Sequence, residues 1–148
     1  MLKVYGADFS GAMNPKIYYV YGVLDDKSLT LKSYTECDDR LDLYHAICHS
    51  GKSIWGLDCP FSIPAEAITT LGYHSKNEML VSVARMTRKG FAQFLADKIT
   101  DYPRKCIDDD RTYCRYTDVA VQAHSVFKTV NPNLRVMFYA GLKLISYL

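Results

Sequence analysis

Residues Lys3–Gly11 read KVYGADFSG, an apolar run that carries one carboxylate, Asp8, to its end and then breaks into a turn of small residues. A second stretch, Ser53–Pro60 (SIWGLDCP), repeats this pattern with Asp58 at the end of its apolar run. A charge at the end of a buried strand costs free energy unless something pairs with it. The two aspartates therefore predict a shared cation where the two strand ends meet.

The composition limits the class of protein. The chain has 148 residues, 49% hydrophobic and 23% charged, as is typical of one soluble globular domain with a real core. A formal net charge of +2 does not indicate a nucleic-acid binder, so any basic surface must come from local clustering. The five cysteines include no C-x-x-C pair, which argues against a disulfide framework and a zinc knuckle. No run is long and apolar enough to span a bilayer, and no signal peptide is evident, so we expect a cytoplasmic protein without a membrane partner.

The first part of the chain predicts an antiparallel meander. Leu2–Phe9 alternates with a period of two, as a central strand does. Lys16–Leu24 (KIYYVYGVL) is rich in β-branched and aromatic residues, and Ser28–Ser33 (SLTLKS) is a shorter alternating segment. Short connections between three successive strands favour antiparallel pairing.

A crossover helix and a parallel strand are expected next. Cys37–Asp39 offers a helix N-cap, apolar residues follow at three- and four-residue spacing, and Gly51 supplies a C-terminal stop. Ile54–Leu57 is apolar without alternation, as expected of a strand that is covered on both faces and runs parallel to the first. This topology predicts that Asp58 lies near Asp8.

The second half of the chain is expected to be mainly helical. A short helix is predicted over Pro64–Leu71, Ser75–Glu78 has the form of a capping box, and Leu134–Leu148 carries a helical apolar stripe. We expect one domain over residues 1–148, with a sheet core in 1–60, a helical insertion in 61–130 and a helix that returns to the sheet in 131–148.

These elements and two motifs resemble known proteins. Three antiparallel strands, a helix and a parallel fourth strand open the ribonuclease H-like fold and each half of the actin-like ATPases. Gly6–Gly11 (GADFSG) and Trp55–Pro64 (WGLDCPFSIP) are similar to the two signatures of DUF429, a family of predicted nucleases of ribonuclease H-like fold. Arg115–Asp118 (RYTD) is similar to an Arg-x-Thr-acid segment of that family.

The resemblance implies an α/β fold with a ribonuclease H-like mixed sheet, followed by a mainly helical second half. A complete fold of this type has a further parallel strand after the helix that begins near Leu134, whereas the sequence ends at Leu148. The expectation is therefore a truncated form that lacks the last strand or strands, or a sheet completed by another chain, as in a homo-oligomer.

The resemblance also implies a chemistry. In ribonuclease H-like nucleases, carboxylates on adjacent strands hold Mg²⁺ or Mn²⁺ ions, which bind the scissile phosphate and generate hydroxide. Asp8 and Asp58 would be the metal ligands, with Asp118 or a residue beyond the end of the sequence as the third catalytic carboxylate. Arg115 would contact the phosphate of a nucleic-acid partner, since an Arg fork matches phosphate geometry. Ser10 and Gly11 are further candidates for binding phosphate or substrate. The plainer interpretation is that Asp8 and Asp58 only cap turns at strand ends.

Other functions stay open. The turn Ser10–Ala12 could present backbone N–H groups to a phosphate, as in actin-like ATPases and sugar kinases, with Asp8 coordinating the Mg²⁺ of a bound nucleotide. Such a short motif is more often an ordinary hairpin turn. A third hypothesis is a non-catalytic domain of the same fold that contributes an interface.

The remaining candidates are weaker. His45 and His49 are four residues apart on the expected helix, with Asp42 nearby, but such a pair is usually part of a solvated face. Cys59 has no histidine placed near it and is expected to pack as a small apolar residue. A basic set in the second half could hold a phosphate backbone, or could simply be dispersed surface charge; it comprises Arg85, Arg88, Lys89, Arg104, Lys105, Arg111 and Arg115.

Overall fold

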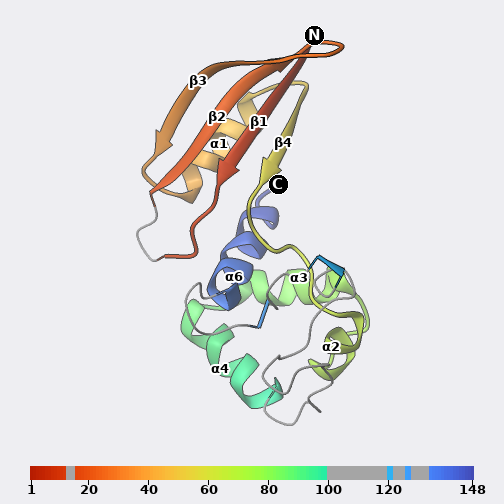
Figure 1. Ribbon diagram of the computed structural model, residues 1–148. Coiled ribbons are helices and arrows are strands. Elements are labelled where there is room, and N and C mark those ends of the chain that lie inside the picture. Colours follow the sequence, from red (N-terminus) through yellow and green to blue (C-terminus); the bar gives the residue numbers. More distant parts are fainter. Residues whose placement is uncertain (13–15, 100–119, 122–125, 128–133) are drawn as a thin grey trace. The chain divides into compact units, whose positions relative to one another are not determined.

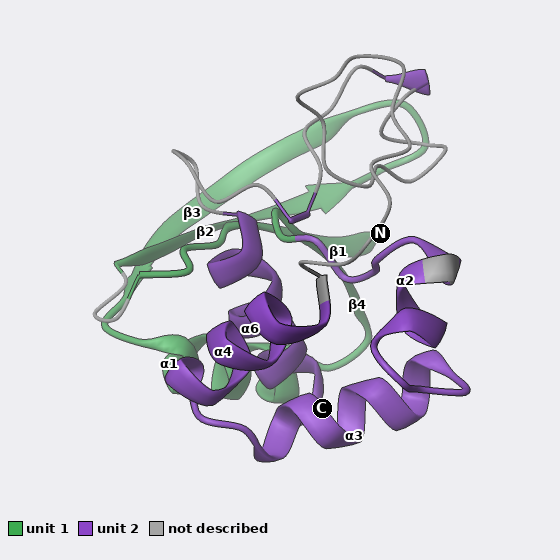
Figure 2. Ribbon diagram, turned by 90° about the horizontal axis from the view of Figure 1, so that it is seen from below, with its two compact units in different colours: residues 1–59, 147–148 green, residues 60–146 purple. Residues whose placement is uncertain are grey.

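The computed structural model describes residues 1–12, 16–99, 120–121, 126–127 and 134–148 of the chain. They belong to two compact units, residues 1–59 with 147–148 and residues 60–146 (Figures 1 and 2). The first unit contains a sheet and one helix, and the described helices after residue 60 belong to the second.

The first unit is built on a four-stranded mixed sheet. Its strands are β1 (Leu2–Asp8), β2 (Ile17–Leu24), β3 (Leu29–Cys37) and β4 (Ser53–Leu57). Their order is β3-β2-β1-β4, with antiparallel pairs β1–β2 and β2–β3 and with β4 parallel to β1. The prediction of an α/β chain with three antiparallel strands and a parallel fourth is thus confirmed.

Strand β3 is longer than its sequence pattern predicts. The alternating segment was expected to end at Ser33, whereas β3 continues to Cys37. Tyr21 pairs with Ser33 and Gly22 pairs with Leu31, so Lys32 lies between two paired residues without a partner of its own. This is the pattern of a β-bulge, which lets pairing continue after one extra residue.

Helix α1 (Arg40–His49) makes the predicted crossover between β3 and β4. The carboxylate of Asp39 caps it, accepting hydrogen bonds from the backbone N–H groups of Leu41 at 2.7 Å and Asp42 at 3.0 Å. Gly51, with φ of +68°, turns the chain after the helix in the left-handed conformation that suits glycine. The side chain of Leu43 is completely buried, as expected where α1 packs on one face of the sheet (Figure 1).

The two faces of the sheet differ in burial. On the face that includes Ala7, Ile17 and Cys37, these side chains are buried. On the opposite face, Val20 is 40% exposed and Ile54 is 56% exposed. The expectation that the fourth strand is covered on both faces was therefore wrong, because one face of β4, the edge strand of the sheet as far as the chain is described, is exposed.

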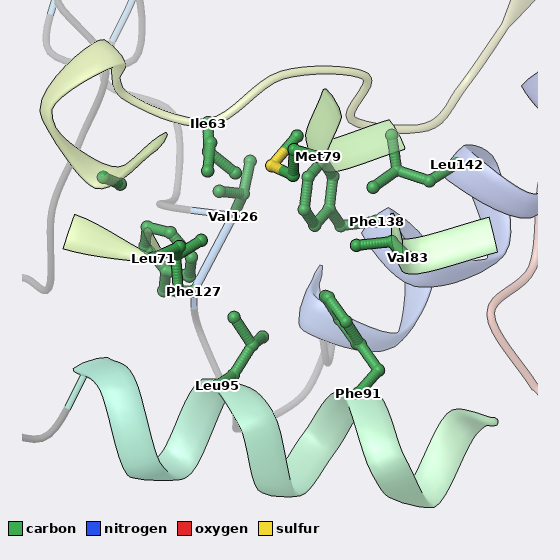
Figure 3. Close-up of a cluster of buried hydrophobic side chains, with 11 residues drawn as sticks. Ile63, Leu71, Met79, Val83, Phe91, Leu95, Val126, Phe127, Phe138 and Leu142 are labelled. Atoms are coloured by element: carbon green, nitrogen blue, oxygen red, sulfur yellow. The ribbon is translucent and has the colours of Figure 1, made fainter. Parts of the chain in front are cut away.

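The second unit has a helical core. Its described helices are α2 (Ala65–Thr70), α3 (Lys76–Arg85), α4 (Arg88–Ile99) and α6 (Leu134–Ile145). Ser75 caps α3 as predicted, and its hydroxyl accepts from Glu78 N at 3.1 Å, although the Glu78 carboxylate reaches back to His74 N. Figure 3 shows the buried cluster, which consists of Ile63, Ala67, Leu71, Met79, Val83, Phe91, Leu95, Val126, Phe127, Phe138 and Leu142.

Among the described residues, no helix has both the length and the apolar character needed to cross a bilayer.

Candidate functional site

The pairing of β1 with β4 brings Asp8 and Asp58 to neighbouring positions. Ala7 is the register partner of Leu57, and Asp58 N donates to Ala7 O at 3.0 Å, so parallel pairing extends to the first residue beyond β4. Adjacent strands are about 4.8 Å apart. Both aspartates are exposed to solvent, which leaves their carboxylates open to a cation or substrate.

A stack of aromatic side chains on one face of the sheet fixes the register of β4 against β1. The rings of Tyr5 and Trp55 are parallel within 6°, with centroids 4.2 Å apart, and they join β1 to β4. Tyr21 stacks on Tyr5 from β2, with centroids 4.9 Å apart. Each aromatic pair adds about 0.5–1.5 kcal/mol beyond the burial of its area. A slip of β4 against β1 would separate the two aspartates and also break this stack.

A small hydrogen-bond network ties the end of α1 to β4. The hydroxyl of Ser50 lies 3.0 Å from Trp55 Nε1, which donates to it, and 2.7 Å from the hydroxyl of Ser53. The Ser50 hydroxyl also donates to Ile47 O at 2.7 Å. Because Ser50 is buried, these bonds hold Trp55 in one orientation within the stack.

The turn that follows Asp8 is held by Arg40, the first residue of α1. Its guanidinium donates from Nη2 to Ser10 O at 3.0 Å and to Ala12 O at 2.6 Å. The same guanidinium lies 5.8 Å from the ring centroid of Phe9, which is only 1% exposed. Sequence reasoning missed Arg40, because its partners are backbone carbonyl groups about 30 residues away and leave no pattern in the sequence.

The same turn is closed on itself. The hydroxyl of Ser10 accepts from Ala12 N at 3.2 Å. The Ala12 N–H that could have pointed at a phosphate is therefore used within the turn, and the carbonyls of Ser10 and Ala12 point to Arg40. One of the backbone N–H groups that a phosphate cradle would use is therefore engaged within the turn.

Glu36 carries a third carboxylate at this end of the sheet, but it lies too far from Asp8 and Asp58 to share a cation with them. Glu36 on β3 is the register partner of Tyr18, which in turn pairs with Asp8, so Glu36 lies two strands from Asp8, or about 10 Å. It is also engaged in an ion pair with Lys16, at 2.6 Å, and the hydrogen bond from Lys16 lowers the pKa of the Glu36 carboxyl.

Cys59, directly after Asp58, is not poised as a nucleophile. Burial, reinforced by the Asp58 carboxylate, raises the pKa of the Cys59 thiol to about 12. A thiol with such a pKa is almost wholly protonated at neutral pH, and the thiolate is the reactive form. The expectation that Cys59 packs as a small apolar residue agrees with this environment.

The histidine pair lies on one face of α1. The rings of His45 and His49 have centroids 6.3 Å apart, and His49 Nδ1 is 2.7 Å from His45 O. Both side chains are exposed, and the carboxylate of Asp42 is used at the start of the helix, where it accepts from Asp38 N at 3.1 Å.

The remaining predicted site residues belong to parts of the chain that the structure does not describe. Asp118 and Arg115 lie outside the described residues, as do Arg104, Lys105 and Arg111. Within the described part of the chain, no group of three or more His, Cys, Asp or Glu side chains could hold a metal ion. Asp8 and Asp58 carry carboxylate oxygens, the kind of hard donor that Mg²⁺ and Mn²⁺ prefer.

No protein-family model matches the chain, and no curated protein or solved structure has significant similarity to it.

Proposed function

We propose that this protein is a metal-dependent phosphodiester hydrolase, a nuclease that binds a divalent cation through Asp8 and Asp58. The observation that carries the proposal is the β1–β4 register, which brings two exposed aspartates to neighbouring backbone positions at the ends of adjacent parallel strands. The strand order β3-β2-β1-β4 with one parallel pair also fits the opening of a ribonuclease H-like sheet.

Each residue of the proposed metal site would have a separate role. Asp8 and Asp58 would hold Mg²⁺ or Mn²⁺, and Arg40 would keep the backbone after Asp8 in place through Ser10 and Ala12. The bound ion would supply Lewis-acid stabilisation of the phosphoryl oxygens and a water of lowered pKa. Asp118 as a third carboxylate, and Arg115 as a phosphate ligand, belong to the same proposal through the DUF429 resemblance.

The nucleotide-binding alternative has less support. It needs backbone N–H groups of Ser10–Ala12 turned toward a phosphate, and the Ala12 N–H is already bonded to the Ser10 hydroxyl. We therefore rank nuclease activity above nucleotide binding, and keep ATP as a probe that distinguishes the two.

The test is cleavage of labelled single- and double-stranded DNA, RNA and an RNA–DNA hybrid, each in the presence of Mg²⁺, Mn²⁺ or EDTA. We expect cleavage of at least one substrate that requires the cation. Asp8→Asn and Asp58→Asn should each lower the rate roughly 100-fold or more, since either change removes a charged ligand. Circular dichroism of each variant would verify that it is folded.

Asp26→Asn is the matched control, because Asp26 is an exposed aspartate in the β2–β3 turn of the same unit. Its activity should equal that of the unchanged protein. Equal activity in Asp8→Asn would refute the proposed metal site. Saturable ATP binding by calorimetry without cleavage of any substrate would replace the nuclease with a nucleotide-binding domain. Absence of both activities would favour the interaction domain.

A further inference from the structure

The second unit contains a small apolar pocket between α4 and α6. Its volume is about 170 Å³, and its walls include Phe91, Ala92 and Leu95 of α4, with Val136 and Tyr139 of α6. An engineered apolar cavity of about 150 Å³ is large enough to bind benzene. The pocket therefore has room for one aromatic ring or a short branched chain.

The aromatic wall of this pocket is fixed before any ligand arrives. The rings of Phe91 and Tyr139 stack with centroids 5.2 Å apart and planes 27° apart. The Tyr139 hydroxyl donates to Met86 O at 2.8 Å, which sets the orientation of its ring. Phe91 is only 3% exposed, so packing restrains its ring as well.

Two arginines line the same pocket, and none of the acidic side chains that the structure describes does. Arg88 is at the start of α4, and Arg135 is in the first turn of α6. Arg135 is half-buried and donates from Nε to Phe127 O at 2.6 Å. Within the described residues, neither guanidinium forms an ion pair with a carboxylate.

These positive charges are partly removed from water. Burial lowers the pKa of the Arg135 guanidinium, which reflects the cost of keeping a cation in this environment. The ammonium group of Lys143 lies 5.8 Å from the Tyr139 ring centroid and adds to the positive charge near the aromatic wall. An anion beside the arginines would offset the cost of desolvation, and a carboxylate can accept two parallel hydrogen bonds from one guanidinium.

We propose that this pocket binds a small organic anion, with one ring or a short branched chain in the apolar cavity and a carboxylate on Arg88 and Arg135. The pocket lies wholly in the second unit, whereas Asp8 and Asp58 belong to the first. The proposal is thus independent of nuclease activity.

The first test is a titration of the isotopically labelled full chain with benzoate, followed by NMR. Benzoate should shift the signals of Ala92, Leu95 and Val136 in a saturable way, with a Kd on the order of 1 mM for so small a ligand. Benzamide, which has nearly the same shape without the charge, should bind about tenfold more weakly or worse. Inorganic phosphate, which has the charge without the ring, should leave these signals unchanged at the same concentration.

Variants test separately how the charge of the two arginines and the apolar cavity contribute to benzoate binding. Arg88→Gln and Arg135→Gln should each weaken benzoate binding about tenfold, and Ala92→Leu should abolish it by filling the pocket while keeping both charges. Lys89→Gln is the matched control, since it removes a positive charge from the same turn of α4 outside the pocket lining. Its affinity for benzoate should be unchanged. Arg88→Gln serves as the independent readout if the loss of the Arg135 bond to Phe127 impairs folding.

Three results would overturn the proposal. Equal affinity for benzoate and benzamide would show that the arginines do not recognise charge. Shifts caused equally by phosphate would reduce the site to a surface anion contact. Undiminished benzoate binding by Ala92→Leu would place the ligand outside the pocket.

Discussion

Arg40→Met should destabilise the sheet unit by about 3 kcal/mol. The substitution keeps much of the aliphatic length of the side chain but removes both hydrogen bonds to the turn after Asp8. The bond to Ser10 O is part-buried and contributes about 2 kcal/mol, while the exposed bond to Ala12 O contributes less, about 0.5 kcal/mol. The contact of the guanidinium with the Phe9 ring adds about 0.5–1 kcal/mol.

Urea unfolding followed by the fluorescence of Trp55, which lies in the sheet unit, would measure this effect. With a slope of about 1.5 kcal/mol per M, the midpoint of the sheet transition should fall by about 2 M. Lys27→Met is the control, because Lys27 is an exposed cation in the β2–β3 turn of the same unit, and its midpoint should move by less than about 0.3 M. A shift for Arg40→Met no larger than that of the control would refute the inference that Arg40 anchors the turn.

Two further predictions concern the same unit. Leu43→Ala, at a completely buried position of α1, should lower the free energy of unfolding by about 2–5 kcal/mol. Leu41→Ala, at a 52% exposed position of the same helix, should lower it by less than about 1 kcal/mol. Equal losses of stability in urea titrations of the two variants would contradict the packing of α1 on the sheet. At pH 8, iodoacetamide should modify the exposed Cys48 well before Cys59, since a thiol with a pKa of about 12 is ionised in only about one molecule in ten thousand. The reaction of Cys59 should become faster as the pH rises toward 12. Peptide mapping by mass spectrometry would measure both rates, and equal rates at pH 8 would exclude the raised pKa of Cys59.

Local patterns in the sequence were sufficient for the order of the strands and for α1. Alternation marked β1, and β-branched and aromatic residues marked β2. Asp39 and Gly51 marked the ends of the crossover helix by capping chemistry. The adjacency of Asp8 and Asp58 then followed from topology, since parallel strands present the same ends at one edge. It stays a prediction that Asp8 and Asp58 are metal ligands. The DUF429 resemblance as a guide to function also stays a prediction.

Features that depend on distant contacts were not predictable. The extra length of β3 requires the bulge at Lys32, which is visible only when β3 is paired with β2. A short apolar run such as Ile54–Leu57 reads the same in an edge strand and in a central strand, so the exposed face of β4 was missed. Arg40 binds backbone carbonyl groups, which every residue has, and the pocket between α4 and α6 arises only when the two helices pack.

The stack of Tyr5 on Trp55 also has a spectroscopic consequence. Trp55 is the single tryptophan of the chain, and it lies within the sheet unit. Its indole emission therefore reports on the sheet unit, whereas circular dichroism sums the sheet and all the helices. With tyrosine rings centred 4.2 Å and 5.3 Å from the indole, light absorbed by Tyr5 and Tyr19 will be emitted by Trp55 while the strands are paired. An increase in tyrosine emission would thus signal separation of the two strands whose pairing brings Asp8 and Asp58 together.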